Sequence, residues 1–105
     1  MKSFKVRVNK EAEEDLRRYT KYVKETFANS QAAKSILLDF RETKRELATI
    51  AASIAEPENN RLKEKGLKRI NFRSHNYFLL FKIVDRTVYI TNVFHGYEDY
   101  ESKLR

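Results

Sequence analysis

Side chains suited to binding a charged substrate are concentrated in one quarter of this 105-residue chain. Residues 61–86 hold eight basic residues and two acidic ones, a net charge of +6 in a chain whose formal net charge is +7. The basic residues are Arg61, Lys63, Lys65, Lys68, Arg69, Arg73, Lys82 and Arg86. A local field of this kind is expected where a protein binds a polyanion, although a basic surface can also serve solubility alone. The charge distribution favours polyanion binding.

The C-terminal region also holds groups that could move protons. His95 is one of two histidines, and imidazole titrates near neutral pH, so it can serve as an acid or a base. Tyr97 could donate a proton or stack on a base, or it could simply pack on the helices. His75 lies in a predicted turn and is expected to be structural or exposed. The chain has no cysteine, which excludes disulfides, thiolate metal sites and cysteine nucleophiles. We expect no metal and no cofactor.

Two helices are predicted before these residues. Apolar positions recur every three or four residues through residues 12–27 and again through residues 33–54. The first series follows Asn9, which is suited to be an N-cap, and the second ends before Pro57. Asn29 or Ser30 offers a break and a second cap between them. Two amphipathic helices with a tight break predict an antiparallel helical hairpin.

Alternation of apolar and polar residues, or a continuous apolar run, marks four strands. They cover residues 4–8, 68–73, 77–84 and 87–94. The third is almost wholly apolar, which is typical of a central strand buried on both faces. Residues 58–67 form a polar loop or a short helical turn, and Asp85-Arg86 makes a two-residue hairpin connection. We predict one α+β domain over residues 1–105: an N-terminal strand, the helical hairpin on one sheet face, and a three-stranded antiparallel β-meander.

The sheet face away from the helices is the expected place for a functional site. By alternation, Arg69, Asn71 and Arg73 share one side of their strand. On the last strand, one side is shared by Tyr89, Thr91, Val93 and His95. If the apolar residues of opposite parity face the helices, the two arginines and His95 lie together on the open face. That combination would suit contacts to phosphates and bases.

Composition excludes several classes of protein. The chain is 41% hydrophobic and has six Tyr and seven Phe, so it can build a core and wholesale disorder is not expected. No apolar run approaches the roughly 18 residues that a membrane span needs. The first ten residues lack the apolar segment of a secretory signal. We expect a soluble, cytoplasmic domain that does not bind membranes.

The order of elements resembles the RelE/ParE superfamily of type II toxins, the small basic toxins of bacterial toxin–antitoxin operons. The resemblance spans essentially the whole chain. It rests on a basic strand after Gly66 (Lys68-Arg69-Ile70), the hydrophobic strand at residues 77–84, a last strand ending in His95, and the acidic-aromatic segment Glu98-Asp99-Tyr100. The joint order and spacing carry the resemblance, which implies a RelE-like two-layer fold.

The resemblance implies a toxin held inactive by a cognate antitoxin, in a possible toxin–antitoxin hetero-oligomer. It also implies one of two targets. RelE-like members cleave mRNA in the ribosomal A site without a metal, whereas ParE-like members bind and poison DNA gyrase without hydrolysing RNA. The leading hypothesis from the sequence is a ribosome-dependent mRNA endonuclease (mRNA interferase) that arrests translation. The alternatives are a ParE-like gyrase inhibitor and a basic nucleic-acid-binding domain without toxin activity.

Metal-free RNA cleavage needs a base for the 2′-hydroxyl, an acid for the leaving 5′-oxygen, and cations for the phosphorane. Arg69 matches the strand arginine of the superfamily and is the candidate for stabilising the phosphate, with Arg73 as a second clamp. His95 and Tyr97 are the candidates for moving protons. Contacts to nucleic acid are assigned to Lys63, Lys65, Lys68, Arg69 and Arg73. Each of these cations could instead be a solvated side chain.

One position departs from the superfamily pattern. Many ribosome-dependent relatives carry an arginine just before the central strand, where this chain has Asn76. Arg73 could compensate from the preceding strand. The absence of an arginine at this position nevertheless favours gyrase inhibition or a weakened toxin.

Overall fold

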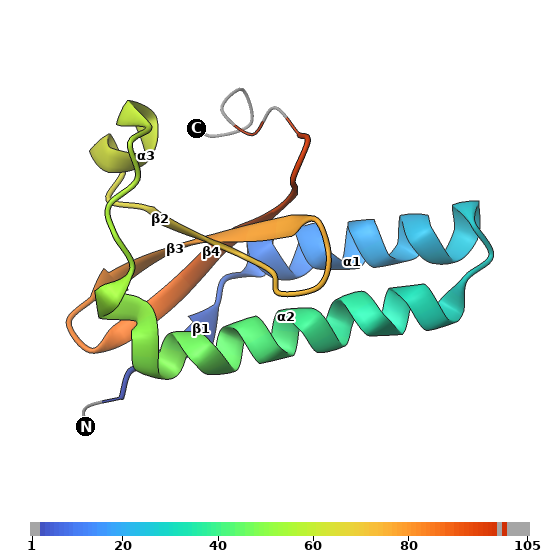
Figure 1. Ribbon diagram of the computed structural model, residues 1–105, viewed down its shortest axis with the longest axis horizontal. Helices are drawn as coiled ribbons and strands as arrows, with labels where there is room; N and C mark the ends of the chain where they lie inside the picture. Colours follow the sequence, from blue (N-terminus) through green and yellow to red (C-terminus); the bar gives the residue numbers. More distant parts are fainter. Residues whose placement is uncertain (1–2, 99, 101–105) are drawn as a thin grey trace.

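The computed structural model describes residues 3–98 and residue 100. Its elements follow the predicted order (Figure 1). They are β1 (Lys5–Val8), α1 (Lys10–Thr26), α2 (Ser30–Ile50), the 3-10 turn η1 (Ala51–Ser53), α3 (Asn60–Glu64), β2 (Lys68–Asn71), β3 (Tyr77–Val84) and β4 (Thr87–His95). Asn29 caps α2, because its side chain accepts the Ala32 N–H at 2.9 Å. The predicted helical hairpin is confirmed.

The strands form one mixed sheet in the order β1-β4-β3-β2. Strands β2, β3 and β4 make the predicted antiparallel meander. Strand β1 adds to it in parallel with β4, so that Val6 lies opposite Val88. A parallel pair needs a long crossover connection, and the helical hairpin begins that connection. The predicted α+β class is confirmed, with a sheet of four strands because the N-terminal strand joins the meander.

One face of the sheet packs on α1 and α2, and this contact forms the main core. Its buried residues are Ala12, Leu16, Ile36, Phe40, Leu47, Ala51, Phe72, Leu79, Phe81, Val88, Ile90 and Val93. Helix α1 also runs along the part of β4 that β1 leaves unpaired. There the buried Asp15 carboxylate accepts the Val93 N–H at 3.0 Å, which satisfies a donor at the edge of the sheet. The two helices therefore cover both the face and an edge of β4.

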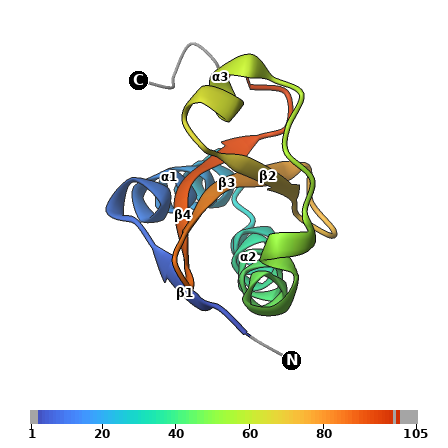
Figure 2. The ribbon, with the colours of Figure 1, turned by 90° about the vertical axis from the view of Figure 1, so that its left-hand side faces the viewer.

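The other face of the sheet is partly covered by α3. Figure 2 shows α2 and α3 on opposite sides of the sheet. Leu62 of α3 and Leu67 pack on Phe78, Leu80 and Phe94, and this second core cluster also contacts Tyr100. Of the two alternatives predicted for residues 58–67, a loop or a short helical turn, the helical turn is present. It covers part of the face that the sequence predicts to be open.

The ends of two elements are informative. Helix α2 stops at Ile50 rather than at residue 54, because the last apolar residues form the tighter turn η1. The Ser53 hydroxyl donates to the Ile50 carbonyl at 2.7 Å and so satisfies a carbonyl at the helix end.

The predicted two-residue hairpin between β3 and β4 is confirmed. Asp85 adopts φ 56° there and takes the left-handed conformation usually given to glycine.

Candidate functional site

The register of β4 separates the predicted site residues. Phe81 pairs with Ile90 but Leu80 pairs with Asn92, so Thr91 is an extra residue that makes a β-bulge. The bulge inverts the alternation of side chains along the rest of β4. Val93 consequently packs in the core beneath the helices, and His95, two residues on, faces the same side. The prediction that His95 lies on the open face is wrong.

Arg69 faces the opposite side of the sheet. Its partner across β2 and β3 is Leu80, whereas the neighbouring pair of Ile70 and Leu79 faces the helices. The half-buried Arg69 places its guanidinium carbon 3.8 Å from the centroid of the Phe78 ring, and its Nε donates to the Asn71 side chain at 3.1 Å. An aromatic ring fixes the orientation of a guanidinium without neutralising it. Arg69 can therefore bind an anion, but on the face away from His95.

Arg73 does not continue the side of β2 on which Arg69 lies. Strand β2 ends at Asn71, and the Arg73 guanidinium forms an ion pair with Glu46 of α2 at 2.8 Å. The expectation that Arg69 and Arg73 clamp one phosphate from a shared face is therefore wrong. The physical reason is the turn between β2 and β3, which is fastened to α2.

Asp39 of α2 holds that turn. Its carboxylate is 6% exposed and accepts the backbone N–H groups of Arg73, Ser74 and His75 at 3.2, 3.0 and 2.8 Å. It also lies 2.7 Å from Nδ1 of His75. Burial alone raises the pKa of Asp39, but the hydrogen bonds from His75 and Ser74 outweigh it and hold this pKa below the ordinary value. His75 was predicted to be structural or exposed, and its contacts with Asp39 give it a structural role.

His95 and Tyr97 lie together at a corner beside α1. The His95 ring centroid is 5.2 Å from that of Tyr77 and 5.6 Å from that of Tyr97. The Tyr97 N–H donates to His95 Nδ1 at 3.3 Å, so Nδ1 is unprotonated when this bond forms. The Tyr97 side chain is 88% exposed. The alternative that Tyr97 packs on the helices is therefore excluded.

Glu98 ties this corner to α1. Its carboxylate accepts the Tyr19 hydroxyl and, at 3.2 Å, the His95 N–H. Arg18 lies over the Tyr19 ring at 5.2 Å and forms an ion pair with Asp15 at 3.3 Å. Burial, followed by the hydrogen bond to Glu98, raises the pKa of Tyr19 well above the ordinary value. The corner thus holds imidazole, phenol and carboxylate groups in contact, with a guanidinium that is already paired.

The Tyr19→Phe substitution is expected to remove one late-titrating tyrosine from the alkaline phenolate absorbance titration. Burial keeps the hydroxyls of Tyr19 and Tyr77 protonated above the ordinary pKa of about 10. Because the folded-state pKa of Tyr19 is raised, its neutral form stabilises the fold below about pH 10, and this contribution is lost as the pH rises through the folded-state value. The exposed Tyr22→Phe variant is the control. An unchanged late titration in Tyr19→Phe contradicts the assignment.

The predicted lysines do not share one face with Arg69. Lys63 in α3 and Lys65 at its C-terminal end are exposed, beside the face that carries Arg69. Lys68 begins β2 and is half-buried, and it lies opposite Phe81, whose side chain packs on the helix side. The structure thus groups only Lys63 and Lys65 with Arg69.

A basic row that was not predicted from the sequence crosses the part of this sheet face that α3 leaves uncovered. Arg7 of β1 lies opposite Tyr89 of β4, which lies opposite Lys82 of β3. Arg7 and Lys82 are exposed and Tyr89 is half-buried between them. Two signals were available: Arg7 alternates with Val6 and Val8, and Lys82 is the only charged residue in residues 77–84. The pairing of β1 with β4, which brings them together, was not predictable from either segment.

Two further findings bear on what this surface can do. Among residues 3–98 and 100, no group of three or more His, Cys, Asp or Glu side chains could hold a metal ion. Within the same residues, no helix has the length and apolar content that crossing a bilayer requires. The row on the sheet face thus consists of two cations and one phenol.

Comparison with known proteins identifies relatives of this fold. The model of the ParE toxin of the type II toxin–antitoxin system parDE matches residues 6–100. The solved chromosomal ParDE toxin–antitoxin system from P. aeruginosa is similar, with a TM-score of 0.73 and 14% identity over 89% of this chain and 96% of that one. The toxin–antitoxin complex RelBE2 from Mycobacterium tuberculosis has a TM-score of 0.58 and 22% identity over 89% of this chain and 98% of that one. No curated protein matches the chain.

The family match covers nearly the whole chain, and the two solved structures share its fold. The resemblance to the RelE/ParE superfamily seen in the sequence is confirmed. The chain belongs to the ParE toxin family and is a type II toxin of the RelE/ParE superfamily.

Proposed function

We propose that this toxin acts by binding its target, as ParE-like inhibitors of DNA gyrase do, and not by cleaving mRNA. The observation that carries the proposal is the placement of Arg69 and His95 on opposite faces of the sheet. With this proposal, gyrase inhibition replaces the mRNA endonuclease as the leading hypothesis. The match to the ParE family supports the same choice.

The physical argument concerns the geometry of phosphodiester cleavage. The acid, the base and the stabilising cation must all reach one phosphate, within hydrogen-bond distance of its reacting oxygens. Arg69 lies across the sheet from His95, and Arg73 is held by Glu46. Arg18 lies near the His95 corner, where it forms an ion pair with Asp15 at 3.3 Å. This arrangement supports binding better than catalysis.

A binding surface suited to a polyanionic target is supplied by the row of Arg7, Tyr89 and Lys82. Exposed cations that flank a half-buried aromatic ring suit contacts with phosphates and with acidic side chains. Arg69, with the lysines of α3, extends the positive charge along the same sheet face. We propose this face as the surface that engages the gyrase–DNA complex.

Induction of the toxin in a bacterial host tests the proposal. The expected result is an SOS response with stalled gyrase on DNA, while transcripts stay intact. Translation arrest with new mRNA ends at codon boundaries contradicts the proposal and returns the mRNA endonuclease to first place. Unaffected growth in the absence of antitoxin also contradicts it and favours a nucleic-acid-binding domain without toxin activity.

The mRNA endonuclease remains the second candidate because of one observation. His95 and Tyr97 are adjacent, and Tyr97 is exposed, so a substrate could reach both. In this alternative the catalytic set is that of the sequence analysis: Arg69, Arg73, His95 and Tyr97. A rearrangement would have to bring Arg69 to the His95 side of the sheet and release Arg73 from Glu46.

Replacement of His95 by Ala separates the two candidates. For a toxin that acts by binding through the basic face, His95→Ala is expected to leave toxicity within about twofold of the original, since the imidazole lies on the other face. Loss of a catalytic acid or base lowers a rate by about 10²–10⁴-fold. Growth inhibition measured over a titrated inducer range is the readout, with circular dichroism to verify folding. A hundredfold loss in a folded variant refutes the binding assignment.

A further inference from the structure

The four strands contain five lysines and arginines but no aspartate or glutamate. Four of these five basic side chains lie on the sheet face away from α1 and α2, and they belong to Lys5, Arg7, Arg69 and Lys82. On β1, for example, Val6 and Val8 pack on the helix side, so the basic residues that alternate with them face the other way. This face of the sheet therefore presents cations, and its strands supply no carboxylate.

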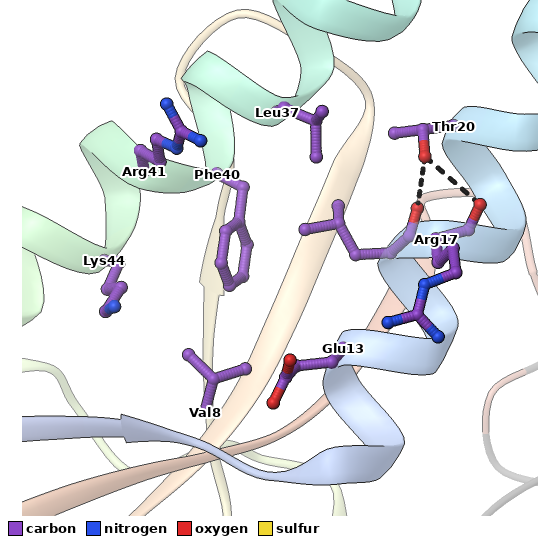
Figure 3. A pocket seen from close by; sticks show the side chains of 9 residues that line it. Val8, Glu13, Arg17, Thr20, Leu37, Phe40, Arg41 and Lys44 are labelled. Atoms are coloured by element: carbon purple, nitrogen blue, oxygen red, sulfur yellow. Dashed lines mark hydrogen bonds between the residues drawn. The ribbon is translucent and has the colours of Figure 1, made fainter.

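The helical side of the molecule differs, because its charges are mixed. Helices α1 and α2 together carry nine basic and eight acidic residues, so their net charge is only +1. The hollow between them is lined by Glu13 as well as by the cations Arg17, Arg41 and Lys44 (Figure 3). A polyanion is therefore attracted more strongly to the sheet face than to the helical side.

The cations of β1 and β3 are not neutralised by the protein itself. Within residues 3–98 and 100, no ion pair involves the side chains of Lys5, Arg7 or Lys82. All three side chains are exposed. Arg73 in the neighbouring turn is different, since it is paired with Glu46 at 2.8 Å. The charge of the three strand cations is available to an external anion.

We infer that this face binds the sugar–phosphate backbone of duplex DNA, so that the toxin contacts the DNA itself in the gyrase–DNA complex. This inference, which rests on the proposed function, names the DNA as the part of the complex that the face engages. Arg7 and Lys82 lie on either side of Tyr89, two strand spacings or about 10 Å apart. This separation lies between the widths of the minor and major grooves of DNA, about 6 and 12 Å. The two cations can therefore reach phosphates on the two strands that border one groove.

Neutral hydrogen-bond donors lie among the cations. The half-buried Thr87 lies opposite Lys5, and the half-buried Tyr89 lies between Arg7 and Lys82. Within the part of the chain that the structure describes, no hydrogen bond engages the hydroxyl of Thr87 or of Tyr89. Threonine and tyrosine hydroxyls contact phosphate oxygens in DNA complexes, together with arginine and lysine. The face thus offers both charged and neutral donors to a phosphate backbone.

The same face lacks the apolar anchor that a protein partner would need. Interfaces between proteins are centred on large apolar or aromatic side chains. Among the described residues, Val84 is the only exposed large hydrophobic one on this face, and it lies at the end of β3. Exposed ion pairs alone contribute little to affinity, whereas contacts to phosphates gain from the release of counterions bound to DNA. The composition of the face therefore favours DNA over an acidic protein surface.

Fluorescence anisotropy of a short labelled DNA duplex tests the inference with the purified full-length toxin and without gyrase. Affinity is measured between about 50 and 200 mM salt, because the slope of log affinity against log salt is about −0.9 for each phosphate contact. The test variant Arg7→Gln/Lys82→Gln removes two charges from the sheet face. The control variant Lys10→Gln/Arg45→Gln removes two charges from exposed positions on α1 and α2. Circular dichroism verifies that both variants are folded.

The original toxin is expected to lose at least about a hundredfold in affinity over this salt range, because four strand cations give a slope of about −3.6. The slope of the test variant is expected to be shallower by about 1.8, while that of the control is unchanged. An unchanged slope in the test variant, or an equal reduction in the control, overturns the inference.

Binding to gyrase without DNA distinguishes the two possible partners of this face. The test variant is expected to bind DNA-free gyrase within about twofold of the original toxin. A tenfold loss there, with an unchanged duplex slope, assigns the face to an acidic surface of gyrase and overturns the inference. Gyrase inhibition by a toxin that does not bind the duplex overturns the inference and leaves the proposed function standing. Duplex binding without gyrase inhibition overturns the proposed function alone.

Discussion

Replacement of Asp39 by Asn is expected to lower the free energy of unfolding by about 3 kcal/mol. The Asp39 carboxylate accepts three consecutive backbone N–H groups and contacts His75 Nδ1, and the side chain is almost fully buried. An amide keeps one acceptor oxygen and places an NH₂ group against the remaining donors. Urea denaturation followed by circular dichroism measures the change. Glu42→Gln, an exposed carboxylate on the same helix, is the matched control and is expected to change stability by less than about 0.5 kcal/mol.

The pH dependence of stability gives a second readout of the same contact. The pKa of Asp39 is lowered in the folded state, so its contribution is fully present above the unfolded value of about 3.9 and is lost as the pH falls through the folded value. The original protein should therefore lose more stability than Asp39→Asn between about pH 5 and pH 2. Parallel stability curves for the two proteins would show that the carboxylate does not hold the turn.

Reversal of two charges on the sheet face, Arg7→Glu with Lys82→Glu, is expected to lower the potency of the toxin by about a hundredfold. Each exposed cation that contacts a charged target is worth about 1.4 kcal/mol, which corresponds to tenfold in affinity. The two side chains are exposed and lie on either side of Tyr89. The fold should be retained, because neither residue belongs to the core. The dose of inducer that halves growth measures potency.

The control for this pair changes the same number of charges elsewhere. Lys10→Glu with Arg45→Glu alters two exposed residues on α1 and α2, outside the sheet face. This variant has the same net charge as the test variant, so a loss of potency in both would assign the effect to net charge. A loss restricted to the Arg7 and Lys82 variant assigns it to the sheet face.

The fold could be predicted from the sequence because its signals are local. Apolar periodicity located α1 and α2, and alternation located β1 and β2. The pairing of β1 with β4 joins residues far apart in the chain, and no local pattern encodes it. The same holds for Asp39, because its carboxylate accepts hydrogen bonds from a turn more than thirty residues away in the chain.

The site was harder to predict because one extra residue in β4, Thr91, changes which side chains share a face of the sheet. Alternation along residues 87–95 places Tyr89 and His95 on one face only if the strand is regular. The extra residue Thr91 inverts that relation, and its sequence context carries no glycine or proline to mark a bulge. Arg73 was misplaced for a similar reason, since β2 ends before it and Glu46 binds its guanidinium. The basic character of the open face was nevertheless predicted, through Arg69.

The most direct test of binding without cleavage uses purified components. The toxin is added to DNA gyrase with a relaxed plasmid and ATP, and in parallel to a translating ribosome system with a labelled mRNA. We expect inhibition of supercoiling or accumulation of cleaved plasmid as the toxin concentration rises, while the mRNA stays full length. Cleavage of the mRNA on ribosomes, with unaffected gyrase, would contradict binding without cleavage and restore Arg69, Arg73, His95 and Tyr97 as a catalytic set.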